Sequence, residues 1–373
     1  MSVKKNENNS SPLTVTTHPG TSPEIVSLLE RTVFGTKGKV RYRQKNIAKG
    51  MSSKSNLEFI QIKKRDQILG TTGIVTRSTT GLKDNFKSLY VRYLSISNPF
   101  RKQKKISLNQ AHSKKKRVSN QLKKMIGNQI TDHFEIPIIT ADEKASFYAF
   151  VESENFNSKE LCINLGFYPT RKISTILFSR FYPQELSSIS RICDVEKEEV
   201  KAQLASFYKN HSFYFEDQLF ESGITFVLRK DNKIVAGIRC KPVHWEIVEL
   251  PGMSGFFMQN VLPYLPVTKK LFNPENLTFL AFDYAWTSNN NIEYILELMS
   301  HACAQFEIHF GMYWGDKESK LISELKESKK LGFINTLNGD ITADVMLRFI
   351  NMNEHEQAEL ISKPVFVSAL DNT

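Results

Sequence analysis

Two carboxylates and one thiol form the most chemically suggestive group in the sequence: Glu152, Glu154 and Cys162. A carboxylate at a strand end can act as a general base, taking a proton from a substrate ammonium through one water. A thiol can donate a proton or accept an acyl group, but a nucleophilic thiol needs a lowered pKa, and the sequence shows no cation or base adjacent to Cys162. The alternatives are solvated strand-end charges for the glutamates and a buried core position for the thiol.

A strongly basic segment covers residues 101–124, where ten Lys or Arg residues occur without any Asp or Glu. It supplies +10 of the formal net charge of +11, which leaves the rest of the chain close to neutral. Three interpretations stay open: a solvated charged loop, a site for cofactor phosphates, and a contact for nucleic acid or an acidic protein. Phe100 is the only aromatic residue at the edge of the segment, whereas nucleic-acid surfaces usually interleave aromatic side chains.

One acid and four aromatic residues stand out in the second half of the chain. Asp283 lies in the middle of an apolar run and needs a partner if it is buried; a structural hydrogen bond explains it better than catalysis. Residues 256–274 are rich in aromatic residues and proline, and could either line an apolar substrate pocket between the halves or pack as a long loop. The aromatic residues concerned are Phe256, Phe257, Tyr264 and Phe272.

The composition is that of a soluble globular protein, with 373 residues of which 40% are hydrophobic and 24% charged. No apolar run reaches the roughly 18 residues that a membrane-spanning helix needs. Residues 1–12 are polar, lack the apolar stretch of a signal peptide, and are predicted to be a disordered tail. The four cysteines and eight histidines form no ligand-like cluster, so we expect free thiols, a cytoplasmic location, no metal and no membrane contact.

Two unlike landmarks repeat along the chain at nearly the same offset. Gly70 and Gly237, each near the start of the second strand of a predicted hairpin, lie 167 residues apart. The triplets Leu165-Gly166-Phe167 and Leu331-Gly332-Phe333, each predicted to close a short helix, lie 166 residues apart. We therefore expect a duplicated fold. Its predicted parts are a first domain over residues 13–183, a linker over 184–190 and a second domain over 191–373.

The elements that must position the chemical groups follow the same order in both halves: helix, hairpin, strand, helix, strand, short helix and closing strand. Ser22-Pro23-Glu24 combines an N-cap residue, a proline and an acid in the way a helix start does. Residues 35–55, rich in Gly, Lys, Arg and Ser, are predicted to be a loop. Predicted strands are 13–17, 57–63, 68–77, 86–97, 146–151, 173–181, 224–228, 233–242, 277–286, 308–314 and 344–350. Predicted helices, besides the one that starts at Ser22, are 113–130, 158–165, 196–210, 290–306 and 319–330.

This order, with one local motif, resembles the GNAT superfamily of N-acetyltransferases. The family motif places an Asn, a small residue, a Leu often followed by Tyr, and then Leu-Gly-Phe. The corresponding residues are Asn155, Ser158, Leu161, Cys162 in place of Tyr, and Leu165-Gly166-Phe167. The resemblance covers most of residues 13–350. It implies an α/β (α+β) fold of two GNAT-like domains, each a mixed, mostly antiparallel twisted sheet flanked by helices.

The resemblance also implies acetyl-CoA or another acyl-CoA as co-substrate, bound by the first half. In the family, the pantetheine arm bonds to exposed backbone of a central strand, and the pyrophosphate to a glycine-rich loop at the next helix start, where free N–H groups face an anion. The implied cofactor residues are Leu94, Ser95, Ile96, Lys116, Arg117, Val118, Ser119, Asn120 and Asn155. Arg117 and Ser119 replace two family glycines, so cationic side chains would have to bind the phosphates instead.

The same position in the second half, residues 287–292, has neither glycine nor cation, so we expect that half to be structural or to shape the substrate site. The best functional hypothesis is an acyl-CoA-dependent N-acyltransferase that acts on a small-molecule or peptide amine. The alternative is a non-catalytic GNAT-like binding protein that uses residues 101–124 to contact nucleic acid or an acidic partner.

Overall fold

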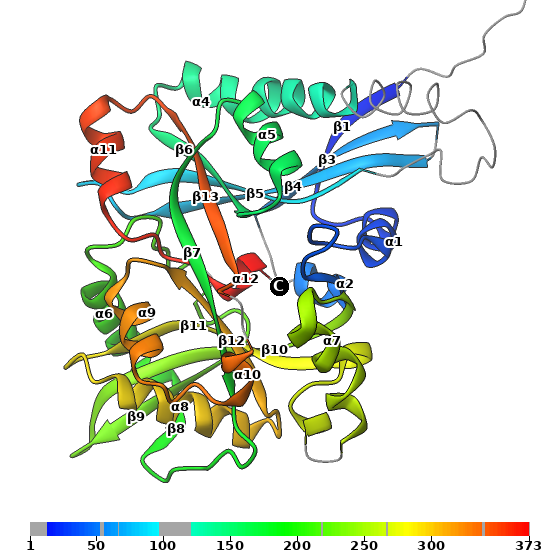
Figure 1. Ribbon diagram of the computed structural model, residues 1–373. Helices are drawn as coiled ribbons and strands as arrows, with labels where there is room; N and C mark the ends of the chain where they lie inside the picture. The colour runs from blue at the N-terminus through cyan, green and yellow to red at the C-terminus, as the bar shows by residue number, and fades with distance from the viewer. Residues whose placement is uncertain are drawn as a thin grey trace, which may run out of the picture.

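The computed structural model describes residues 13–52, 56–65, 67–96, 121–217, 219–265, 268–337 and 340–372. Within these ranges the strands form one continuous, mostly antiparallel sheet with helices on its faces (Figure 1). The predicted fold class, a mixed α/β structure with a mostly antiparallel sheet flanked by helices, is therefore confirmed.

The first half follows the predicted order. Its elements are β1 (Leu13–Pro19), α1 (Pro23–Arg31), β2 (Arg41–Gln44), α2 (Ile47–Ser52), β3 (Leu57–Lys64), β4 (Gln67–Thr79), β5 (Phe86–Ile96), a helix over 121–129, a π-helical turn (Ile130–Glu135), α4 (Ile136–Thr140), β6 (Ala145–Glu152), α5 (Phe156–Asn164) and β7 (Tyr168–Ser179). The Ser22 hydroxyl accepts a hydrogen bond from the Ile25 N–H, which confirms the predicted N-cap of α1.

The second half repeats the order and adds two helices after its closing strand. Its elements are β8 (Ile189–Arg191), α6 (Lys197–Tyr208), β9 (Ile224–Lys230), β10 (Lys233–Glu249), α7 (Gly252–Asn260), β11 (Leu277–Thr287), α8 (Ile292–Gln305), β12 (Phe310–Asp316), α9 (Lys320–Glu327), α10 (Phe333–Thr336), β13 (Thr342–Ile350), α11 (Glu354–Ser362) and α12 (Ala369–Asn372).

Two stretches that were predicted as loop or linker contain strands. The predicted loop over residues 35–55 holds β2 and α2, and β8 begins inside the predicted linker. The sequence of β2 lacks an apolar alternation, and the segment is a strand because it pairs antiparallel with β10, where Gln44 lies opposite Trp245. Both segments are strands because they pair with strands from elsewhere in the chain, and a local sequence pattern does not encode that pairing.

The two Leu-Gly-Phe triplets share an offset but not a structure. Gly166 (φ +81°) follows α5, and the N–H groups of Gly166 and Phe167 donate to the Ile163 and Cys162 carbonyls, which is a Schellman motif. Gly332 (φ +98°) lies beyond the end of α9 and precedes α10, so the prediction that it closes that helix is wrong. A Cβ at Gly332 would lie 2.1 Å from the Ser179 carbonyl oxygen, so this glycine allows close approach to β7.

The sheet has the strand order β1-β3-β4-β5-β6-β13-β7-β12-β11-β10-β9-β8, with β2 attached to β10. Among the described strands, only β5–β6 and β11–β12 pair in parallel, and they occupy equivalent positions in the two halves. The helix over 121–129 packs Leu122 and Ile126 on the first half of the sheet, and α8 packs Ile295, Met299 and Cys303 on the second. The helix predicted over residues 290–306 is therefore present as α8.

The closing strands change places between the halves. β13, from the second half, lies between β6 and β7 and pairs antiparallel with both, whereas β7 pairs on its other side with β12. Each half thus receives from the other the strand that extends its sheet (Figure 1). The predicted domain boundary near residue 183 divides the chain but does not divide the sheet.

Because β6 needs β13 and β12 needs β7, we expect fragments 1–183 and 184–373 to be unable to form stable sheets when each is expressed alone, since each would expose unpaired strand edges. Co-expression should give a one-to-one complex, measured by co-purification through a tag on one fragment. Two fragments that each unfold cooperatively in isolation would contradict this expectation and would support two autonomous domains.

Candidate functional site

The strands of the first parallel pair diverge after a short paired region. Residues 87–90 of β5 lie opposite residues 145–148 of β6, and beyond Tyr90 and Tyr148 no described residue pair joins the two strands. β5 nevertheless continues to Ile96 and stays paired with β4. Tyr93 has a left-handed backbone (φ +55°) and lies where the register with β4 shifts, so a bulge marks the divergence.

The second parallel pair has the same construction. Residues 280–282 of β11 lie opposite residues 311–313 of β12, and Tyr284 (φ +46°) then forms a bulge where the register with β10 shifts. A left-handed backbone is rare for a bulky residue and clusters at functional sites. It occurs at equivalent positions of β5 and β11, and the sequence pattern did not reveal it.

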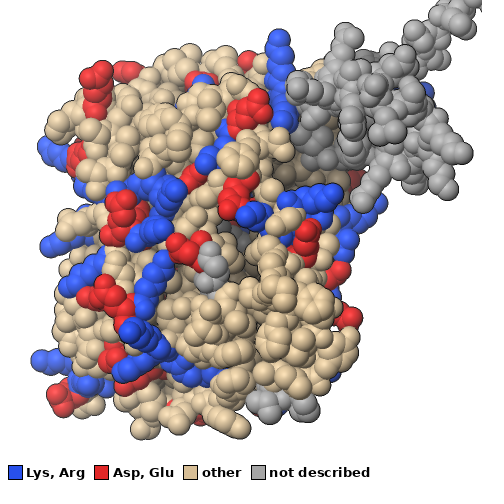
Figure 2. Space-filling view, viewed as in Figure 1, with Lys and Arg blue, Asp and Glu red and all other residues tan. Residues whose placement is uncertain are grey.

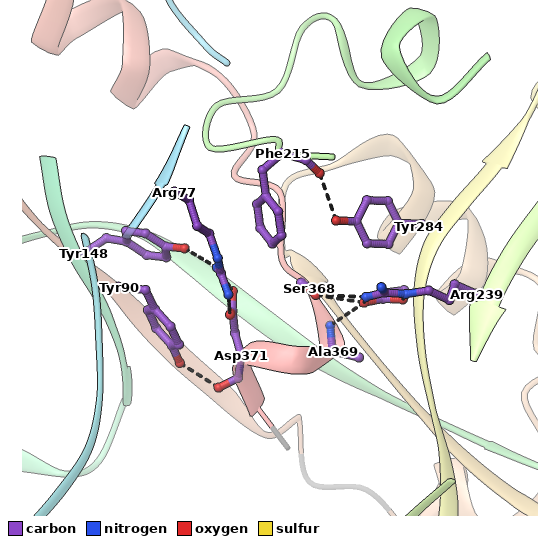
Figure 3. A network of polar contacts seen from close by, with 10 residues as sticks. Arg77, Tyr90, Tyr148, Phe215, Arg239, Tyr284, Ser368, Ala369 and Asp371 are labelled. Atoms are coloured by element: carbon purple, nitrogen blue, oxygen red, sulfur yellow. Dashed lines mark hydrogen bonds and ion pairs between the residues drawn. The ribbon is translucent and has the colours of Figure 1, made fainter. Parts of the chain in front are cut away.

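The C-terminal segment covers the bulge of the second half. The Ser368 hydroxyl and the Ala369 N–H each donate to Asp283 Oδ2 over 2.9 Å (Figure 3). Asp283 is buried and also accepts two hydrogen bonds from Arg239, at 2.7 and 2.5 Å. The structural partner that was predicted for Asp283 is therefore present. The Phe366 ring packs 4.8 Å from the Tyr284 ring, so this half of the sheet is occupied by the chain itself.

The same segment continues to the first half. Asp371, buried in α12, binds the Arg77 guanidinium through two hydrogen bonds of 3.0 and 2.6 Å (Figure 3). Arg77 also donates to the Tyr148 hydroxyl, and the Tyr90 hydroxyl donates to the Asp371 carbonyl. Burial alone would lower the pKa of Arg77, but the carboxylate of Asp371 raises it above its usual value. The C-terminal segment thus connects the two parallel strand pairs, β5–β6 and β11–β12, at the centre of the molecule.

Glu152, at the end of β6, is held by the segment that follows α1. The N–H and the hydroxyl of Thr36 both donate to Glu152 Oε2, at 3.2 and 2.9 Å. Within the described ranges, the other carboxylate oxygen of Glu152 accepts no hydrogen bond. The predicted base therefore has one oxygen that Thr36 orients and one oxygen without a hydrogen bond to any described residue.

Residues 34–44, which we call the bridging segment, connect this carboxylate to the second half. Arg41 pairs with Glu249 over 3.1 Å, and Arg43 pairs with Glu246 over 2.6 Å. The Tyr42 ring stacks on the buried Trp245 ring at 3.8 Å. Burial and then the charge of Glu152 raise the pKa of Tyr42 well above its usual value, so this phenol stays neutral beside the carboxylate.

The other predicted site residues lie in different environments. Glu154 forms an exposed ion pair with Lys39 of the bridging segment. Asn155 caps α5, because its Oδ1 accepts the Ser158 N–H at 3.1 Å. Leu94, Ser95 and Ile96 lie on β5 beyond the bulge, where the Ser95 hydroxyl is 2.8 Å from the Thr32 hydroxyl. Residues 116–120 lie outside the described residues, as does most of the basic segment over 101–124.

Cys162 lies on α5 against the apolar cluster beneath the helix over 121–129. Burial raises the pKa of this thiol to about 11, so it carries its proton at neutral pH. A neutral thiol is a poor nucleophile. This environment favours the core-packing alternative for Cys162 over an acyl acceptor.

The aromatic residues of 256–274 do not share one environment. Phe272 is buried, whereas Phe256 and Tyr264 are 59% and 81% exposed. They therefore do not line a common pocket between the halves. Across the described parts of the chain, no helix combines the length and hydropathy needed to cross a bilayer, and no group of His, Cys, Asp or Glu side chains is arranged to hold a metal ion.

Solved structures share the fold. The chain is similar to N-myristoyltransferase from Saccharomyces cerevisiae with bound myristoyl-CoA: 9% identity, 95% of this chain and 89% of that chain covered, TM-score 0.56. A second structure of the yeast enzyme, with myristoyl-CoA and inhibitors, gives 10% identity, 91% and 81% coverage, and TM-score 0.54. A weaker likeness is a GCN5-related N-acetyltransferase from Anabaena variabilis, with 9% identity, 90% and 72% coverage, and TM-score 0.46.

No family model matches the sequence, and a search of curated proteins found no relative. At these low identities the likeness to the yeast enzyme establishes the fold and nothing finer. The reaction, the acyl group and the acceptor are therefore matters for proposal.

Several residues of the central arrangement were not identified from the sequence. Tyr42 meets Trp245 because β2 pairs with β10, and Thr36 lies in the segment that leads to β2. No local pattern signals that pairing. Arg77 and Asp371 are 294 residues apart. One signal was available for Arg77, because a cation in the apolar strand 68–77 needs a partner when buried.

We expect Asp371→Asn to lower the free energy of unfolding by about 3–5 kcal/mol, because it leaves Arg77 buried without its counter-charge. The matched control is Glu318→Gln, which breaks the pair of Arg171 with a carboxylate that is 77% exposed and should cost below about 1 kcal/mol. Urea unfolding followed by circular dichroism measures both. Equal losses of unfolding free energy in the two variants would show that the ion pair of Arg77 with Asp371 does not anchor the C-terminal segment.

We expect Cys162 to remain unmodified when the folded protein is incubated with acetyl-CoA or myristoyl-CoA, since burial keeps its thiol protonated. Intact-mass and peptide mass spectrometry measure the modification. Alkylation by iodoacetamide provides the control, because the exposed Cys193 should react and the folded Cys162 should not. An acyl thioester on Cys162 would restore its predicted role as acceptor.

Proposed function

We propose that the chain is an acyl-CoA-dependent N-acyltransferase that binds its acyl-CoA on the first half and transfers the acyl group to an amine. The observation that carries this proposal is the divergence of β5 from β6 after the bulge at Tyr93. It occurs in a fold shared with an enzyme whose structure contains myristoyl-CoA. The amine belongs to a small molecule or a peptide.

The cofactor would lie along the edge of β5 that β6 no longer covers. Backbone groups of Leu94, Ser95 and Ile96 on that edge are available to an extended chain that carries amides, such as pantetheine, in the way a strand adds to a sheet. In the second half, contacts of residues 366–369 with Asp283 and Tyr284 occupy the matching region. This difference favours one cofactor site per chain. Residues 116–120 remain the proposed contact for the phosphates.

The reaction would begin with a proton transfer from the acceptor ammonium to Glu152. Thr36 orients one oxygen of this carboxylate and leaves the other for the substrate. The free amine then attacks the thioester carbonyl, and backbone N–H groups beside the bulge stabilise the oxyanion. The C–S bond breaks, the amide forms as the attacking nitrogen releases its second proton, and the departing thiolate takes up that proton. Glu154 is the weaker candidate because Lys39 already engages it.

Calorimetric titration of the full chain with CoA, acetyl-CoA and myristoyl-CoA tests the cofactor. We expect at least one acyl-CoA to bind with a stoichiometry near one. Absence of binding by every acyl-CoA at near-millimolar concentration would overturn the proposal. Two equivalent sites per chain would overturn the assignment of the cofactor to the first half alone.

We expect Glu152→Gln to lower turnover by roughly 100-fold or more, because it removes the proton acceptor, while acyl-CoA affinity stays unchanged. Glu154→Gln is the matched control two residues away and should change turnover less than about threefold, since its carboxylate pairs with Lys39 at the surface. Release of CoA thiol across a panel of amines and peptides gives the rate. Similar rates for both variants would exclude Glu152 as the base.

A further inference from the structure

The exposed face of α7 is apolar, which reverses the usual orientation of a surface helix. Met253, Phe256 and Phe257 follow a spacing of three and four residues and therefore share one side of the helix. Met253 is 84% exposed, and the two phenylalanines are also exposed. The helix buries Gly255 and Met258 on its other side.

This exposed face continues into the next turn of the chain. Tyr264 and Leu265 are exposed as well, and together with the three side chains on α7 they form what we call the α7 patch. The region over α7 in Figure 2 is correspondingly almost free of charged side chains. Single exposed apolar residues are ordinary on protein surfaces, but a cluster on one protruding element marks an interaction site.

The charges within the segment that carries the patch have one sign. Residues 251–274 contain Lys269 and Lys270 and no Asp or Glu. Both lysines are exposed and lie four and five residues beyond Leu265. An apolar face flanked by cations is complementary to an anionic lipid surface, which offers acyl chains beneath a layer of negative headgroups.

Two polar side chains of the helix already form hydrogen bonds within the chain. The Asn260 amide donates to the Phe256 carbonyl at 3.0 Å, and the Gln259 side chain accepts the Leu250 N–H at 3.1 Å. A protein partner usually supplies and receives about one hydrogen bond per 100–200 Å² of interface. The patch has few groups for such bonds, whereas a bilayer requires none.

We infer that the α7 patch docks peripherally on an anionic lipid bilayer, with Met253, Phe256 and Phe257 entering the headgroup region and Lys269 and Lys270 facing the headgroups. This goes beyond the proposed acyl transfer and does not depend on it. It also departs from the expectation of no membrane contact, which rested on the lack of a spanning segment; peripheral docking needs only an exposed apolar face with cations beside it.

Flotation of the full chain with vesicles tests the inference. We expect binding to vesicles of phosphatidylcholine mixed with phosphatidylserine and much weaker binding to phosphatidylcholine alone. The combined variant Met253→Ser, Phe256→Ser and Phe257→Ser should lower the partition coefficient on mixed vesicles at least tenfold. Lys269→Ala and Lys270→Ala should each lower it by about fivefold.

The matched control is Phe156→Ser, which removes a 75% exposed aromatic side chain from the first turn of another helix, α5, and should leave vesicle binding unchanged. Circular dichroism verifies that each variant is folded. Because residues 101–124 are also basic, a variant with Ala at Lys114, Lys115, Lys116 and Arg117 is measured in parallel. Loss of binding in that variant alone, with the α7 variant unaffected, would overturn the inference.

Two other outcomes would also contradict it. Failure of the wild-type chain to float with mixed vesicles at any lipid concentration tested would exclude bilayer docking. A dimer, detected by light scattering, that the α7 variant converts to a monomer while vesicle binding is absent would assign the patch to a contact between two copies of the chain.

Discussion

The antiparallel pairing of β7 with β13 is the interaction on which the rest of the structure depends. Each of these strands is the last strand of its own half along the chain. Each nevertheless pairs with a strand of the other half, β13 with β6 and β7 with β12. The pairing therefore merges the two halves into one sheet and places both parallel strand pairs on either side of a common centre. It also brings the residues that follow β13 to that centre, where α12 lies (Figure 1).

The contacts that the C-terminal segment makes at the centre differ between the two halves. Two buried ion pairs, Arg77 with Asp371 and Arg239 with Asp283, are joined by the C-terminal segment (Figure 3). Buried pairs of this kind add little net stability but fix one arrangement, because any other leaves a charge without a partner. The C-terminal segment thereby covers the bulge of the second half, and among the described residues none pairs with the corresponding strand edge of the first half. This difference is the reason why we propose one cofactor site rather than two.

Much of the fold could be predicted from the sequence because it rests on local signals. Ser22 caps α1, Gly166 ends α5, and the apolar spacing of α8 reports its buried face. The site was less accessible to prediction. Glu152 was found as a carboxylate at a strand end, and Leu94–Ile96 came from the family resemblance. Thr36 was missed because it belongs to the bridging segment, whose local pattern is typical of a loop. The bulges at Tyr93 and Tyr284 were missed because ordinary residues adopt left-handed conformations there under sheet geometry alone.

The exchange of closing strands has a consequence for how the chain reaches this structure during synthesis. β6 ends at residue 152, but its partner β13 ends at residue 350. A ribosome adds roughly 5–20 residues per second, so one edge of β6 waits about 10–40 s for its partner. During that interval the nascent chain displays an unpaired edge of aromatic residues, Phe147, Tyr148 and Phe150, that is suited to pairing with the wrong strand. Early folding of this protein thus depends on holding a half-finished sheet apart from its neighbours until the last tenth of the chain has emerged.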